Sequence, residues 1–281
     1  MIIPHFVGIG PQKTGSTWLH EVLLQHDSIV LPRGVKETMF FDCYYNKGLD
    51  WYINWFSIGN IEKQKIGEIA PTYFDHLSTI NRIYCLNPQC KILISIRNPI
   101  AKAISLHHHH LNKGRVSPLF SEAVEKMPEI ITSGHYSKYI PTWMDKFGER
   151  QIKLIFLDDI QHNPEKVWQD LCSFLEISRI PLPSIANQAI NEKKMSKFPW
   201  LAKLASATAI KMREYKMHNL VEKAKKIGLY SVYSGGESRI IPLTDKEYEN
   251  LTRLYYDDIK FLEQLTSRDL SSWYRLTKNN E

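Results

Sequence analysis

Short apolar runs alternate along the chain with longer segments in which apolar residues recur every three or four positions. A short run that is apolar on both faces is typical of a strand buried in a parallel sheet, and the longer spacing is typical of a helix with one buried face. Strands are predicted at His5–Gly10, Lys65–Ile69, Lys91–Ile96 and Ile152–Leu157. Helices are predicted at Ser16–His26, Ala101–Asn112, Tyr136–Phe147 and Pro164–Leu175.

This alternation predicts an α/β fold in three layers, with a central, mainly parallel sheet flanked by helices. The chain has 281 residues and no linker-like or repetitive tract, so we expect one domain over residues 1–281. Ligands of such sheets bind at the carboxyl ends of the strands. Binding residues are therefore expected in the segments that directly follow each strand.

Composition narrows the range of partners. The net charge of +6 is small and scattered, which suits an anionic ligand but does not indicate nucleic acid. No apolar run is long enough for a membrane-spanning helix. The beginning of the chain reads as a strand and not as a signal peptide, so a cytoplasmic location is expected. The sequence does not indicate an oligomeric state.

The loop after the first strand has the composition of a phosphate site. It contains two glycines and leads directly into a helix, whose N-terminus attracts anions. We expect its ligand-binding residues to be Lys13, Thr14, Gly15, Ser16 and Thr17. A Walker A loop would have lysine at position 16, where this chain has serine. The fold is therefore expected to be P-loop-like, but with its lysine inside the loop.

A second phosphate site is predicted after the strand Lys91–Ile96. Arg97 follows that strand, Pro99 suits the first turn of the next helix, and Ser105 lies nearly two turns along it. Arginine binds phosphate oxygens in pairs through its planar fork. Arg97 and Ser105 are therefore expected to bind one phosphate together.

These two segments resemble the PAPS-dependent sulfotransferases, where PAPS is 3'-phosphoadenosine-5'-phosphosulfate. The loop Pro11–Trp18 resembles their 5'-phosphosulfate loop, and Arg97, Pro99 and Ser105 match their 3'-phosphate motif RxPxxRxxS. The resemblance implies that PAPS is the donor and PAP, the desulfonated nucleotide, the product. It also places Trp18 against the adenine. The chain departs from the motif at its second arginine, which is Lys102.

The segment KETMFFD, residues 36–42, resembles the KExxFFD segment of heparan-sulfate-type enzymes. The resemblance implies that Glu37 is the catalytic base and Lys36 its charge partner. The apolar residues after Glu37 would raise its pKa by desolvation. Glu68, in a second segment that resembles this group, is a reserve candidate for the base. The acceptor is expected to be a glycan or another small hydroxylated or amine-bearing molecule.

Further predictions follow from the rest of the chain. The resemblance to sulfotransferases implies that a basic loop near this point closes over the donor, and it makes Lys193, Lys194 and Lys197 candidates for binding it. Asp158 and Asp159 are expected to cap a helix. No metal site is expected, because the consecutive residues His107–His110 point in different directions on a helix. Two other functions stay open: a P-loop kinase that uses ATP with Mg²⁺, and a non-catalytic nucleotide-binding protein.

Overall fold

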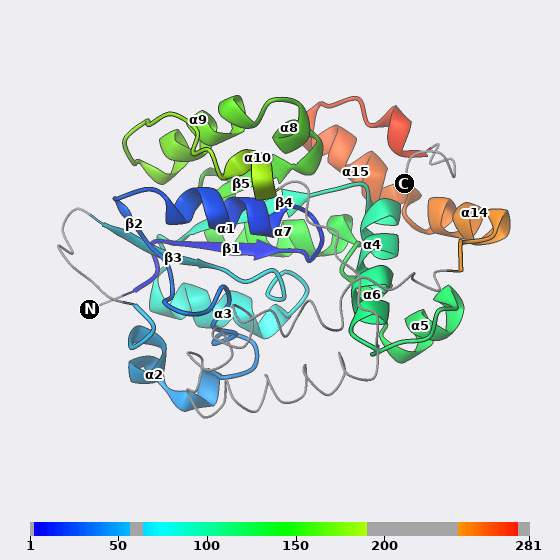
Figure 1. The fold of residues 1–281 in the computed structure, drawn as a ribbon, viewed down its shortest axis with the longest axis horizontal. Helices are drawn as coiled ribbons and strands as arrows, with labels where there is room; N and C mark the ends of the chain where they lie inside the picture. The colour runs from blue at the N-terminus through cyan, green and yellow to red at the C-terminus, as the bar shows by residue number, and fades with distance from the viewer. Residues whose placement is uncertain (1–2, 57–63, 190–240, 275–281) are drawn as a thin grey trace. The chain divides into compact units, whose positions relative to one another are not determined.

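The computed structural model of the protein describes residues 3–56, 64–189 and 241–274, and it contains a parallel sheet of five strands (Figure 1). The strand order is β2-β3-β1-β4-β5, and every pair is parallel. The strands are β1 (Phe6–Gly10), β2 (Ile29–Val30), β3 (Lys65–Ile69), β4 (Lys91–Ile96) and β5 (Ile152–Phe156). The predicted α/β class with a covered parallel sheet is confirmed.

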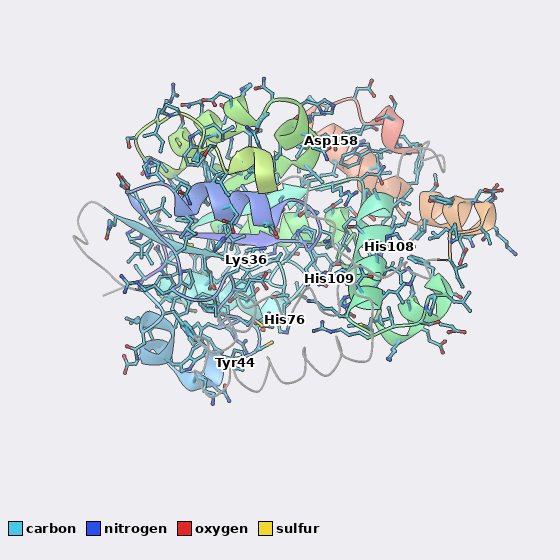
Figure 2. All side chains as sticks on the ribbon, in the orientation of Figure 1. Lys36, Tyr44, His76, His108, His109 and Asp158 are labelled. Carbon is cyan, nitrogen blue, oxygen red and sulfur yellow. The ribbon has the colours of Figure 1, made fainter. Side chains whose placement is uncertain are left out.

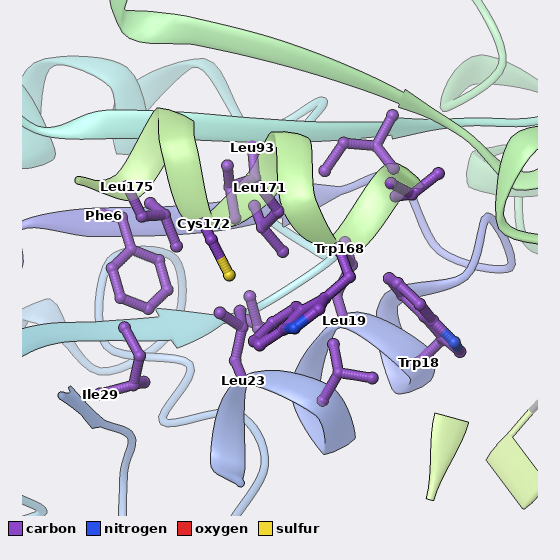
Figure 3. Packing of buried hydrophobic residues seen from close by; sticks show 14 of the residues in the cluster. Phe6, Trp18, Leu19, Leu23, Ile29, Leu93, Trp168, Leu171, Cys172 and Leu175 are labelled. Carbon is purple, nitrogen blue, oxygen red and sulfur yellow. The ribbon is translucent and has the colours of Figure 1, made fainter. Parts of the chain in front are cut away.

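One face of the sheet packs against α1 (Ser16–Leu24) and α9 (Pro164–Leu175). Their inner faces join β-strand side chains in one cluster (Figure 3), and its buried members include Phe6, Leu19, Leu93, Trp168 and Leu171. The opposite face carries α3 (Leu77–Leu86), beside which α7 (Tyr136–Phe147) packs (Figure 1). Because both faces are covered, the strands consist of continuous apolar runs.

The chain changes direction in the sheet between β1 and β4. From β1 it continues to β2 and β3 on one side, and from β4 it continues to β5 on the other. At such a switch point the loops that follow the two central strands turn to opposite faces and leave room for a ligand. The loop after β1 and the segment after β4 both begin here, so the two predicted phosphate motifs start from neighbouring strands.

The described residues divide into two compact units, and each is considered by itself. The first comprises Met1–Asn98 and His135–Glu192, and contains the whole sheet. It also includes α2 (Leu49–Ile53), α8 (Leu157–His162), α10 (Ala186–Ala189) and two short turns of 3-10 helix, Tyr45–Lys47 and Glu149–Gln151. The expectation of a single domain stays a prediction.

The second unit comprises Pro99–Gly134 and Lys193–Glu281. Its described helices are α4 (Pro99–Asn112), α5 (Phe120–Lys126), α6 (Glu129–Thr132), α14 (Asp245–Leu254), α15 (Tyr256–Thr266) and the 3-10 turn Ser271–Tyr274. Tyr255 joins α14 to α15, and its hydroxyl donates to the carbonyl of Ile131 at 2.8 Å. Within the described residues, no helix is both long enough and apolar enough to cross a membrane.

Most predicted elements agree with the structure, and the differences lie at their ends. β3, β4, α7 and α9 have the predicted bounds. The fifth strand ends at Phe156, one residue early, because Leu157 already begins α8. Asp158 and Asp159 therefore lie inside the first turn of that helix, and the predicted cap is wrong: the N-cap residue is Phe156. Acidic side chains in a first turn still interact favourably with the helix dipole.

Candidate active site

The loop between β1 and α1 depends on two glycines with positive φ. Gly10 has a φ of +93°, and a Cβ at this position would lie 2.5 Å from both the Cα and the carbonyl oxygen of Pro71. Gly15 has a φ of +103° and is the N-cap residue of α1. No side chain caps that helix, so its first-turn N–H groups are not used by a side-chain acceptor. The sequence thus forms a loop with backbone donors for an anion.

Inside the loop, Thr14 provides an internal support. Its hydroxyl lies 2.6 Å from the carbonyl of Pro11, to which it donates, and 2.5 Å from the hydroxyl of Ser95 on β4. The Thr14 side chain is fully buried. Lys13, just before it, adopts a left-handed conformation with φ of 70° and is half-buried. Thr14 therefore ties the loop to β4, and any contact of Thr14 with a ligand would come from its backbone.

Arg97 joins this loop from the end of β4. Its Nη1 donates to the carbonyl of Lys13 at 3.4 Å. Tyr136 on α7 holds the Arg97 backbone, because its hydroxyl donates to the Arg97 carbonyl at 2.7 Å and accepts from the Arg97 N–H at 3.3 Å. Burial lowers the pKa of Arg97, and Tyr136 and Asp158 oppose that shift. Arginine remains a cation in proteins. Lys13 and Arg97 therefore place two positive charges where β1 and β4 end.

A third cation reaches the start of α1 from a distant segment. The Lys36 Nζ donates to the hydroxyls of Ser16 at 3.1 Å and Thr17 at 3.3 Å, and it lies 3.7 Å from Oε1 of Glu37 (Figure 2 labels Lys36). Burial lowers the pKa of Lys36, and the neighbouring carboxylate of Glu37 opposes that shift. A Walker A lysine would arise from position 16 itself. Here a lysine from another segment binds the hydroxyl at that position.

The two candidate bases have different environments. The Glu37 side chain is 28% exposed and pairs with Lys36. Glu68, at the end of β3, is fully buried. Oε2 of Glu68 accepts from the Thr38 N–H at 3.2 Å and the Thr38 hydroxyl at 2.7 Å, and Oε1 accepts from the Tyr73 hydroxyl at 3.2 Å. Burial raises the pKa of Glu68 to about 7, against those hydrogen bonds. Glu37 is therefore open to an acceptor, while Glu68 is enclosed.

Comparison with known proteins decides the family. The sequence matches the sulfotransferase domain over residues 4–226, which is most of the chain. The chain belongs to the sulfotransferase family. The predicted resemblance to PAPS-dependent sulfotransferases is confirmed at this level, and with it the enzyme class.

Relatives of this sulfotransferase include bifunctional heparan sulfate N-deacetylase/N-sulfotransferases. The Drosophila melanogaster protein is 27% identical over 97% of this chain and 27% of its own length. The human protein 2 is 26% identical over 63% of this chain and 22% of its own length. The chain thus spans about a quarter of the length of these relatives. A sulfotransferase structure from Alicyclobacillus acidocaldarius shows the same fold, with a TM-score of 0.69, 23% identity, and coverage of 98% of this chain and 100% of that one.

The other predicted donor residues of the sulfotransferase are not all brought to this loop. Trp18 is 2% exposed and belongs to the buried cluster (Figure 3), so its stacking on an adenine stays a prediction. Ser105 lies on α4 in the second unit, and its pairing with Arg97 also stays a prediction. Lys193, Lys194 and Lys197 lie outside the described residues.

Two features of α4 are explained by its packing. Lys102 is fully buried, and its Nζ donates to the carbonyl of Ile130 at 3.3 Å and to the hydroxyl of Ser133. The lysine that replaces the second arginine of the motif thus binds protein oxygens within its own unit. His107 and His110 are buried rather than lying on the surface or a cleft wall. Among the described residues, no three His, Cys, Asp or Glu side chains gather as metal ligands would.

Two contacts that organise this site are not predicted by any pattern in the sequence. The sequence predicts Tyr136 only as the first residue of a helix, and in the structure its hydroxyl holds the backbone of Arg97. Lys36 was noted as a partner of Glu37, and it also binds Ser16 and Thr17. No spacing along the chain relates these residues. A lysine just before a candidate base was the only signal for the second contact.

Proposed function

We propose that this sulfotransferase transfers the sulfuryl group of PAPS to a hydroxyl or amine of a glycan, with Glu37 as the base. The observation that carries the proposal is the contact of Lys36 with Ser16 and Thr17. Lys36 and Glu37 are adjacent in the chain and lie 3.7 Å apart as a charge pair. The contact of Lys36 therefore brings Glu37 close to the loop Pro11–Trp18, which we call the phosphosulfate loop. The relatives named for heparan sulfate N-sulfotransfer support a glycan acceptor.

The loop around Lys13 would hold the 5'-phosphosulfate, and Arg97, with Ser105, would hold the 3'-phosphate. Glu37 would accept the proton from the acceptor as the new bond to sulfur forms. The bond between sulfur and the bridging oxygen breaks, and its electron pair leaves with PAP. Negative charge thus develops on the 5'-phosphate, where Lys13, Lys36 and the first-turn N–H groups would stabilise it. Such fixed donors typically contribute a few kcal/mol each to the transition state.

This chemistry needs no metal ion, because fixed lysine and arginine side chains supply the positive charge. A P-loop kinase would instead need Mg²⁺ on a triphosphate. The sulfotransferase-domain match over residues 4–226 favours the sulfotransferase, and so does Ser16, which stands where a Walker A loop would have its lysine.

The donor half of the proposal can be tested by thermal unfolding. PAP should raise the Tm of the wild-type protein, as a ligand that binds only the folded state does. Lys13→Ala and Arg97→Ala should abolish that rise, whereas Lys166→Ala, which removes an exposed lysine from α9, should keep it. A rise with ATP and Mg²⁺ but none with PAP would support the kinase instead.

The acceptor half can be tested by transfer from sulfur-labelled PAPS. A de-N-sulfated glycosaminoglycan with free amines, its N-acetylated counterpart and a simple phenol should distinguish an amine, a sugar hydroxyl and an aryl hydroxyl. Glu37→Gln should lower turnover about 100-fold or more, as loss of a general base does, while the Tm rise with PAP persists. Glu165→Gln, on the outside of α9, is the control. Unchanged turnover in Glu37→Gln would exclude this carboxylate as the base.

A further inference from the structure

A buried carboxylate binds the residue that follows the proposed base in the chain. Glu68 belongs to β3, which lies between β2 and β1 in the sheet, and its side chain has no exposed surface. Its direct partners are Thr38, the residue after Glu37, and Tyr73. An enclosed carboxylate is costly unless its oxygens accept hydrogen bonds, so a fold retains one only where it is well bonded.

Three backbone N–H groups of the segment after Glu37 converge on this carboxylate. The Thr38 N–H donates to it directly, at 3.2 Å. The Phe40 N–H donates to the Thr38 hydroxyl at 3.2 Å, and that hydroxyl donates to Glu68 at 2.7 Å. The Phe41 N–H donates to the Tyr73 hydroxyl at 3.2 Å, and that hydroxyl donates to Glu68 at 3.2 Å. Each hydroxyl thus accepts from the backbone and donates to the carboxylate.

The segment needs such an anchor because it is not part of the sheet or of a helix. Residues 36–39 have no regular secondary structure, and Met39 has a positive φ of 54°, which is unfavourable for a residue with a side chain. Backbone N–H groups that are buried in irregular structure require other acceptors. The carboxylate of Glu68 supplies them, directly or through one hydroxyl.

We propose that Glu68 is a positioning residue, which fixes the backbone of residues 38–41 and thereby holds Lys36 and Glu37 against the phosphosulfate loop. The inference rests on the proposed function of Glu37. It assigns Glu68 a role in transfer other than that of the base, since the carboxylate is enclosed, accepts from Thr38 and Tyr73, and has the Tyr52 hydroxyl beside it.

Glu68→Gln is the nearly isosteric test. At pH 8, where Glu68 is ionised, the wild-type carboxylate accepts from both Thr38 and Tyr73. In Glu68→Gln at that pH, the amide oxygen can still accept from Thr38, but the NH₂ group faces the Tyr73 hydroxyl, which also donates. Amide hydrogen exchange at Thr38, Phe40 and Phe41 should become at least tenfold faster, while the amides of β4, such as Leu93, should stay protected. With PAPS as donor, kcat should fall at least tenfold, while the Kd of PAP should change less than threefold.

A second pair of variants covers the case in which Glu68→Gln does not fold. Thr38→Val keeps the shape of the side chain and removes the hydroxyl, whereas Thr38→Ser keeps the hydroxyl. Thr38→Val should reproduce the faster exchange at Phe40 and the lower kcat, and Thr38→Ser should restore both. If Thr38→Ser restores the slow exchange at Phe40 and the kcat, the hydrogen bond of the hydroxyl is what the segment requires, and not the packing of the Thr38 methyl group.

The outcomes distinguish this proposal from the proposed function. Unchanged hydrogen exchange at the three amides in Glu68→Gln would overturn the proposal that Glu68 anchors residues 38–41, whether or not the protein uses PAPS as its donor. Faster exchange with an unchanged kcat, or a parallel loss of PAP affinity, would overturn the positioning role. If the wild-type protein neither binds PAP nor transfers sulfate, the proposed function fails, and the positioning of a base fails with it.

Discussion

At the scale of single residues, the site is held by side chains that would not themselves meet the substrate. Tyr136 fixes the backbone of Arg97, Thr14 ties the loop to β4, and Glu68 holds the segment after Glu37. Catalytic groups must be kept close to their working geometry by such supports. The motifs predict Thr14 as a ligand-binding residue and Glu68 as a reserve base, yet the side chains of both contact groups of the protein itself.

Tyr136→Phe tests the support of Arg97. The substitution keeps the buried ring and removes one hydroxyl, so the carbonyl and the N–H of Arg97 lose their partner. Leaving buried polar groups unpaired costs about 1–3 kcal/mol, and we expect the Tm to fall by several degrees. The Kd of PAP, measured by calorimetry, should rise about tenfold. Tyr139→Phe on the same helix should leave the Kd unchanged. An unchanged Kd in Tyr136→Phe would contradict a role for this hydroxyl in placing Arg97.

Lys36→Met tests the cation that enters from outside the loop. Negative charge on the bridging oxygen grows as the sulfuryl group leaves. Removing the Lys36 cation should therefore lower kcat more than it lowers the affinity for PAP. We expect kcat to fall on the order of 100-fold, the range for removing one fixed donor, with a smaller effect on PAP affinity. Lys36→Arg keeps the charge and should retain more turnover than Lys36→Met. Equal turnover in the two variants would show that the charge of Lys36 is not what the reaction uses.

At the scale of elements, the sequence predicts the interior better than the edges. β4 and α9 have their predicted bounds because a doubly buried strand and a one-sided helix have clear periodicities. β2 was missed because it is only two residues long, Ile29–Val30. The path of residues 36–41 was unpredictable for another reason: it is set by hydrogen bonds to Glu68 and Tyr73, which no local pattern shows.

The packing of two loops can be tested through Gly10. Alanine at this position would need a left-handed φ of +93° and would bring a Cβ to 2.5 Å from the backbone of Pro71. Gly148→Ala is the matched control, because its φ is +81° but nothing lies within 4 Å of the added Cβ. Strain alone costs about 1–3 kcal/mol. In chemical denaturation, Gly10→Ala should therefore lose clearly more stability than Gly148→Ala, and should also lose PAP binding. Equal losses would mean that the contact with Pro71 relaxes freely.

At the scale of the whole molecule, the buried carboxylate should be visible in the pH dependence of stability. Glu68 has a pKa raised to about 7 from an ordinary value of 4.5, chiefly by burial. Between pH 4.5 and pH 7, the folded protein keeps a proton on Glu68 that the unfolded chain releases. Stability contributed by this group is therefore full below pH 4.5 and falls as the pH rises toward 7. The titratable groups around it, Tyr52, Tyr73 and Cys90, have pKa values raised by burial and stay neutral in this range.

The measurement is urea denaturation of the wild-type protein and of Glu68→Gln between pH 4.5 and 7.5. Other groups titrate in this range, including His107 and His110, whose pKa values are lowered by burial and which give the opposite slope. These groups contribute equally to the stability of both proteins, so their contributions cancel when the stability of Glu68→Gln is subtracted from that of the wild-type protein. A shift of this size corresponds to about 3 kcal/mol, so the wild-type protein should lose about that much stability relative to Glu68→Gln as the pH rises to 7. A difference that stays constant with pH would mean that Glu68 binds no more protons in the folded protein than in the unfolded chain. The carboxylate would then be ionised throughout, with its three donors outweighing its burial.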